Sequence, residues 1–236
     1  MTRPARSALG VDAFPKGWVG VLWAGPGTAP SVRHGASFAA LMAAVDAVAG
    51  PSAIGVDIPL ELLETGRRRA DDQVRAVLGP RRSSLFLTPV RAAIEEDDWT
   101  AASALQRSLG GFGMSKQAHA LRRSIGQARA WTAATGRALH EVHPETSFAV
   151  LGGAGALPAA PMPAAKATWA GAMARRALLA GAGLALPDDI GPTGAVVPPT
   201  DVLDAAAAAW SAWRIATGAA LSWPVDAAPG EPRIWA

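Results

Sequence analysis

The chain has 236 residues and a mass of 24.1 kDa, a length typical of one α/β domain. It contains no cysteine, which excludes disulfide scaffolds, zinc fingers, iron–sulfur clusters and thiol catalysis. Half of the residues are apolar, which excludes intrinsic disorder, and the formal net charge of only +3 gives a weak indication of a nucleic-acid partner.

The first 58 residues predict three strands, a helix and a fourth strand. Apolar runs at 8–12 and 18–23 are joined by a Pro- and Gly-containing turn, and a third strand is expected at 31–36. Apolar residues at helical spacing follow at 38–48, and a buried type of strand at 53–58. This order differs from the strict alternation of a doubly wound nucleotide-binding fold.

The rest of the chain predicts a mostly helical insertion at about 67–135, then a fifth strand and two further helices. We therefore expect a single domain over residues 1–236. The expected helices are 68–78, 97–109, 115–134, 166–182 and 200–217, the strand is 137–142, and the loops are 81–89, 151–165, 187–199 and a Pro-rich tail from 223.

Several acidic residues occupy unusual positions. Asp12 and Asp57 each end a Gly-Val-Asp tripeptide at the end of an expected strand, where burial and β-propensity disfavour aspartate. Glu145 follows the fifth strand, and Asp201 and Asp204 lie in the first turn of the last helix. Each has an ordinary explanation as a turn or helix-cap residue, but together they predict carboxylates meeting at one edge of the sheet.

Carboxylates that meet in this way repel each other unless a proton or a cation neutralises them. Oxygen ligands in a chain without cysteine favour a hard ion, Mg²⁺ or Mn²⁺. Two such ions about 3.5–4 Å apart can stabilise both the attacking and the leaving oxygen of a phosphodiester. The pattern therefore favours phosphoryl-transfer chemistry.

Taken together, the motifs of this chain resemble those of the domain-of-unknown-function family 429, a group of predicted nucleases with an RNase H-like fold. The resemblance covers nearly the whole chain and rests on the segments 10–12, 16–18, 55–59, 79–84 with Phe86 and Thr88, 141–145 with Phe148, and 201–205. It implies a mixed five-stranded sheet, with three antiparallel strands and then parallel strands, flanked by helices. It also implies Asp12, Asp57, Glu145 and Asp204 as catalytic metal ligands, with Asp204 preferred to Asp201.

Residues expected to bind the substrate lie in loops near the strand ends. Lys16, Arg81, Arg82, Ser83 and Lys116 could hold phosphate groups, although ordinary exposed loop charge explains them equally well. His143 could orient Glu145, but a structural histidine is the simpler interpretation.

We expect a hydrolase that cleaves DNA or RNA phosphodiester bonds by a two-metal-ion mechanism. The alternative is a catalytically inactive RNase H-fold module that binds nucleic acid or protein. An actin-like-fold phosphotransferase is a less favoured alternative, since that fold normally needs two such domains and this chain has the length of one. The apolar runs near both ends are short or interrupted by charges, so we expect a cytoplasmic protein without a membrane segment.

Overall fold

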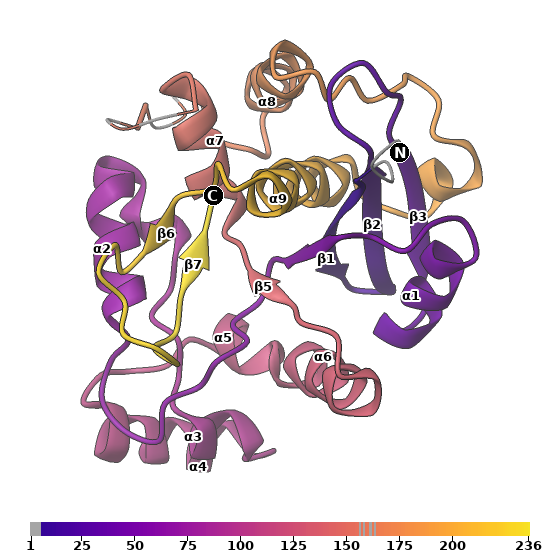
Figure 1. Cartoon of the computed structure of the whole chain (residues 1–236). Coiled ribbons are helices and arrows are strands. Elements are labelled where there is room, and N and C mark those ends of the chain that lie inside the picture. Colours follow the sequence, from indigo (N-terminus) through magenta and orange to yellow (C-terminus); the bar gives the residue numbers. More distant parts are fainter. Residues whose placement is uncertain (1–5, 156, 158, 161, 163) are drawn as a thin grey trace.

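A mixed five-stranded sheet forms the centre of the computed structural model, which describes residues 6–155, 157, 159–160, 162 and 164–236 (Figure 1). The strands lie in the order β3-β2-β1-β4-β5, antiparallel within β3-β2-β1 and parallel from β1 to β5. This confirms the expected sheet. The strands are β1 Ala8–Phe14, β2 Gly17–Trp23, β3 Ser31–Gly35, β4 Ala53–Val56 and β5 His140–Glu141.

Helices cover both faces of the sheet because its strands carry apolar residues on both faces. On one face, Leu9 and Val11 of β1 pack with Phe38 of α1 (Phe38–Asp46) and Trp131 of α6 (Arg122–Thr135). On the other face, Val19, Val21 and Trp23 of β2 pack with the alanine-rich α9 (Pro199–Thr217) and with α7 (Pro144–Gly152). Figure 1 shows α9 running alongside β1 and β2, with α1 on the far side of these strands.

The close approach of α9 to the sheet depends on two glycines. A Cβ atom on Gly10 of β1 would lie 1.9 Å from the Ala209 nitrogen and 2.1 Å from the Ala205 oxygen. A Cβ atom on Gly55 of β4 would lie 2.9 Å from the Ala208 oxygen. The helix backbone therefore rests directly on the strands, where no other residue type leaves enough space.

Helices fill the segment between β4 and β5, and some of them differ from the expected ones. Ser115 begins a helix as expected, but a tight turn at Leu121, whose N–H donates to the Ala118 oxygen, divides it into α5 and α6. Part of the expected loop at 81–89 is a 3₁₀ helix, favoured by Pro80 at its start. The remaining elements are α2 Arg69–Leu78, η1 Gly79–Ser84, α3 Arg91–Glu95, α4 Trp99–Leu105, η2 Gln106–Gly110 and α5 Lys116–Ala120.

The part of the chain from residue 137 onward corrects three further expectations. α8 (Trp169–Gly181) begins three residues later than expected because the Thr168 side chain caps it, accepting from the Gly171 N–H. α7 extends to Gly152, so the expected loop 151–165 begins inside a helix, while four of its positions, 156, 158, 161 and 163, lie outside the described residues. The expected strand 137–142 is reduced to the two residues of β5.

The tail is not simply a Pro-rich loop. The short 3₁₀ helix η3 (Gly191–Ala195) precedes α9. After α9, the strands β6 (Ser222–Trp223) and β7 (Ile234–Trp235) pair with each other. Trp235 also forms a β-bridge with Val142, next to β5. None of the described helices has both the length and the apolar character required to cross a membrane.

Candidate metal centre

The two Gly-Val-Asp tripeptides lie side by side because β1 and β4 pair in parallel. Gly10 is opposite Gly55, Val11 is opposite Val56, and the Asp57 N–H donates to the Val11 oxygen at 2.9 Å. Asp12 within β1 and Asp57 directly after β4 therefore occupy equivalent positions along two neighbouring segments. β1 continues to Phe14, so Asp12 lies inside the strand and not at its end as expected.

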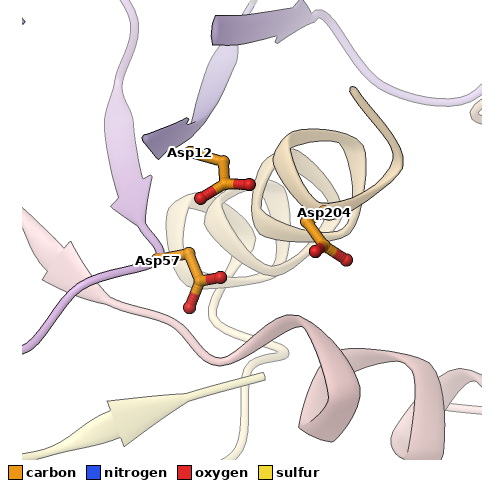
Figure 2. Close-up of side chains that lie close together, drawn as sticks. All are labelled: Asp12, Asp57 and Asp204. Atoms are coloured by element: carbon orange, nitrogen blue, oxygen red, sulfur yellow. The ribbon is translucent and has the colours of Figure 1, made fainter. Parts of the chain in front are cut away.

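α9 brings the third carboxylate to the same place. Asp12 and Gly10 are two residues apart, so they share the face of β1 on which α9 rests. Asp204 directly precedes Ala205, one of the α9 residues in contact with Gly10. One carboxylate oxygen from each of Asp12, Asp57 and Asp204 lies within 4.8 Å of the others, and Figure 2 shows the three side chains around a common space.

Burial and mutual repulsion disfavour the charged form of all three aspartates. Burial raises the pKa of Asp12 well above its usual value, and the charges of Asp57 and Asp204 raise it further. Burial and then Asp204 likewise raise the pKa of Asp57. The pKa of Asp204 is also raised by its burial, although Lys166 opposes this. The site therefore attracts either protons or a cation.

Lys166 contributes a positive charge that the sequence analysis did not identify. Its Nζ lies 2.7 Å from Oδ2 of Asp204, and its side chain is half exposed while that of Asp204 is buried. Burial alone would lower the pKa of Lys166, but Asp204, followed by Asp57 and Asp12, raises it. The residue precedes α8 in a Gly-, Ala- and Pro-rich stretch, where no sequence pattern marks it as a site residue.

Glu145 and Asp201, the other acidic candidates, do not belong to this group of three aspartates. The Glu145 Oε1 accepts from the buried Arg175 of α8 at 2.5 Å. Asp201 is partly exposed one turn before Asp204 on α9, and its carboxylate accepts from the Thr200 hydroxyl. Both residues line the same cavity as the three aspartates without joining their cluster.

A second charged group, also not anticipated from the sequence, lies beside the site. The buried Arg68 donates to Oε2 of Glu141 at 2.8 Å and to Oδ1 of Asp71 at 3.0 Å. The Leu60 N–H donates to Glu141, and the Thr88 N–H donates to Asp71. These bonds join β5, α2 and the segment that follows Asp57, so Arg68 holds together the loops around the metal centre.

A cavity of about 560 Å³ contains the aspartates and some of the residues expected to bind substrate. Arg81 and Ser83 line it, together with His143, whose pKa is lowered to about 4 by burial. Lys16, Arg82 and Lys116 are not among the described residues that line it. Lys16 is exposed in the β1–β2 turn, the Arg82 carbonyl accepts from Arg75, and Lys116 lies 5.2 Å from the centre of the Trp99 ring.

The donor set of the aspartate cluster fits a hard divalent cation. It consists of carboxylate oxygens from Asp12, Asp57 and Asp204, with no softer ligand in the group. Mg²⁺ and Mn²⁺ prefer such ligands. A cation would also offset the repulsion and burial that raise the three pKa values. This triad, in which Asp12 and Asp204 are buried and Asp57 is half-buried, can therefore hold a metal ion.

The chain belongs to the family described as "Protein of unknown function (DUF429)", whose model matches residues 10–228. The matched region includes every residue of the aspartate cluster as well as Lys166 and Arg175. Comparisons with curated proteins and with solved structures gave no match.

Proposed function

We propose that this protein is a divalent-metal-dependent phosphodiesterase that cleaves nucleic acid. The observation that carries the proposal is the meeting of Asp12, Asp57 and Asp204 within 4.8 Å, although they come from distant parts of the chain. Buried aspartates that lack enough positive charge are costly to maintain. A site that binds a catalytic cation gives a physical reason for that cost.

The residues around the cluster suit a phosphodiester. Asp12, Asp57 and Asp204 would hold the cation, which when bound activates a water molecule and offsets the charge that develops on the phosphate. Arg81 and Ser83 line the same cavity and provide donors for phosphate oxygens. The mixed sheet, with acidic residues on β1, after β4 and on the last long helix, agrees with the RNase H-like arrangement that the sequence motifs imply.

One observation favours a second candidate, a nucleic-acid-binding module without catalytic activity. Of the four carboxylates expected as metal ligands, Asp204 is paired with Lys166 and Glu145 with Arg175. A site that has lost its metal would gain stability from such pairs. Activity measurements separate the two candidates.

Replacing Asp12 with asparagine tests the proposal. We expect Asp12→Asn to reduce Mn²⁺-dependent cleavage of labelled DNA and RNA oligonucleotides by about 10³-fold or more, because the variant loses a charged ligand while keeping the shape of the side chain. Asp97→Asn is the matched control, since Asp97 is 94% exposed, and it should cleave at the rate of the unaltered protein.

Circular dichroism would show that both variants fold. Cleavage by Asp12→Asn at the unaltered rate would contradict the proposed mechanism. If the unaltered protein binds oligonucleotides without cleaving them, the binding module is the better description.

A further inference from the structure

Two positive side chains enter the acidic site from one short part of the chain. Lys166 lies 2.7 Å from Asp204, and Arg175 lies 2.5 Å from Glu145. Lys166 precedes α8, and Arg175 belongs to its second turn. One helix and the residues leading into it therefore neutralise two of the four carboxylates that the sequence motifs indicate as metal ligands.

The backbone around Lys166 is fixed by several hydrogen bonds. Arg175 donates to the Ala164 oxygen at 3.2 Å as well as to Glu145. The Thr168 hydroxyl and N–H both donate to the Ala165 oxygen, at 2.8 and 3.0 Å, and the same side chain caps α8. Hydrogen bonds to the residues just before and just after Lys166 therefore hold its backbone in a position from which the side chain reaches Asp204.

The remaining charge matches one divalent cation. Asp12, Asp57, Asp204 and Glu145 carry four negative charges when ionised, and Lys166 and Arg175 carry two positive ones. Within the described part of the chain, neither Asp12 nor Asp57 forms a salt bridge. The partly exposed Asp201 adds a charge that solvent screens more strongly.

We propose that the ammonium group of Lys166 takes the place of a second divalent cation, so that this site binds a single ion between Asp12 and Asp57 with Asp204 shared between that ion and the lysine. This inference rests on the metal-binding part of the proposed function. It departs from the two-ion mechanism expected from the sequence. A second ion about 3.5–4 Å from the first would need carboxylates that already have cationic partners, and it would be repelled by the ammonium group.

Lys166 is also placed to contact the substrate. Its side chain is half exposed and lines the cavity that contains Arg81 and Ser83. An ammonium group has three N–H donors, so it can donate to Asp204 and to a phosphate oxygen at the same time. Lys166 would then provide the positive charge that a second ion provides in a two-ion site.

Counting bound Mn²⁺ by calorimetric titration and electron paramagnetic resonance tests this inference without measuring activity. We expect the unaltered protein to bind one Mn²⁺ per chain. Lys166→Met keeps the length of the side chain but removes its charge, so that Asp204, together with the nearby Asp201 in the same cavity, becomes available to a second ion, and this variant should bind two. The control Lys116→Met removes an exposed lysine that does not line the cavity, and it should still bind one.

Lys166→Arg provides a second variant that retains the positive charge, and it should bind one ion. Two ions in the unaltered protein, no ion at all, or one ion in a folded Lys166→Met variant would each overturn the inference. Failure of the proposed function gives a different result. If the unaltered protein binds one Mn²⁺ but cleaves no nucleic acid, the single-ion inference stands and the proposed phosphodiesterase activity is contradicted.

Discussion

At the scale of single residues, some buried charged side chains of this protein have an oppositely charged partner and others do not. Arg68 is buried between Glu141 and Asp71, and these two partners raise its pKa although burial alone would lower it. Arg175 forms a buried ion pair with Glu145. Removing one member of such a pair leaves an uncompensated buried charge. Among the residues that the structure describes, Asp12 and Asp57 have no salt-bridge partner, which marks them as functional candidates.

Asp12 and Asp57 should make the metal-free protein sensitive to pH. The folded pKa of Asp57 is raised above the usual aspartate value of about 3.9. Its contribution to stability is therefore fully present below about pH 4 and is lost as the pH rises through the folded pKa. Asp57→Asn cannot ionise, so it should be more stable than the unaltered protein at pH 7, by about 1 kcal/mol or more, and the difference should disappear toward pH 4.

Urea denaturation in the presence of a chelator, repeated from acid to neutral pH, measures this difference. Asp97→Asn is again the control, and the free energy of unfolding of this variant should follow that of the unaltered protein at each pH. An Asp57→Asn variant that is less stable at pH 7 than the unaltered metal-free protein would contradict the repulsion inferred among the carboxylates.

At the scale of elements, the contact of α9 with β1 and β4 builds the site. Ala205 to Ala209 are fully buried, and small side chains on the helix meet glycines on the strands. This contact fixes the distance between Asp204 and the two strand aspartates. A change that moves α9 away from the sheet would therefore disrupt the fold and the site together.

Gly10→Ala tests this contact. The added Cβ would lie 1.9 Å from a backbone nitrogen of α9, which cannot move without displacing the helix, so we expect a loss of at least ~3 kcal/mol in the free energy of unfolding. Gly126→Ala is the matched control, because Gly126 is exposed in α6 with no atom within 4 Å of its Cβ position. It should be more stable by ~0.5–1 kcal/mol. Equal stability of the two variants would contradict the proposed close packing.

At the scale of the whole molecule, the metal centre connects parts of the chain that are far apart in sequence. Its residues come from β1, the end of β4 and α9, with Lys166 from the segment before α8. An ion bound only by the folded protein stabilises it by about 2.7 kcal/mol when its concentration is 100 times the dissociation constant. Metal binding should therefore raise the free energy of unfolding of the whole protein.

We expect Mn²⁺ to raise the Tm of the unaltered protein and to leave that of Asp12→Asn nearly unchanged, because the variant lacks a ligand. Differential scanning calorimetry with Mn²⁺ or with a chelator measures both. An equal rise in the two proteins would show that Mn²⁺ binds elsewhere.

The local elements that the sequence predicted best are those with strong periodic patterns and clear turns. The sequence predicts the strands at the start of the chain, α1, α2 and α9 within a few residues of their observed bounds, because their apolar spacing and flanking Gly and Pro residues act locally. β5, β6 and β7 are only two residues long, and their pairing depends on partners elsewhere in the chain. Such short strands carry no periodic signal of their own.

The sequence by itself determined the order of the early strands and singled out Asp12, Asp57, Glu145, Asp201 and Asp204, because turn chemistry, strand patterns and the rarity of aspartate at strand positions act over a few residues. The preference for Asp204 over Asp201 came from the family resemblance. Only the tertiary structure decided which carboxylates meet and which are neutralised. Lys166 and Arg175 reach Asp204 and Glu145 across 38 and 30 residues of chain. Electrostatic pairing of this kind depends on distance in space, which the folded sheet and helices alone set.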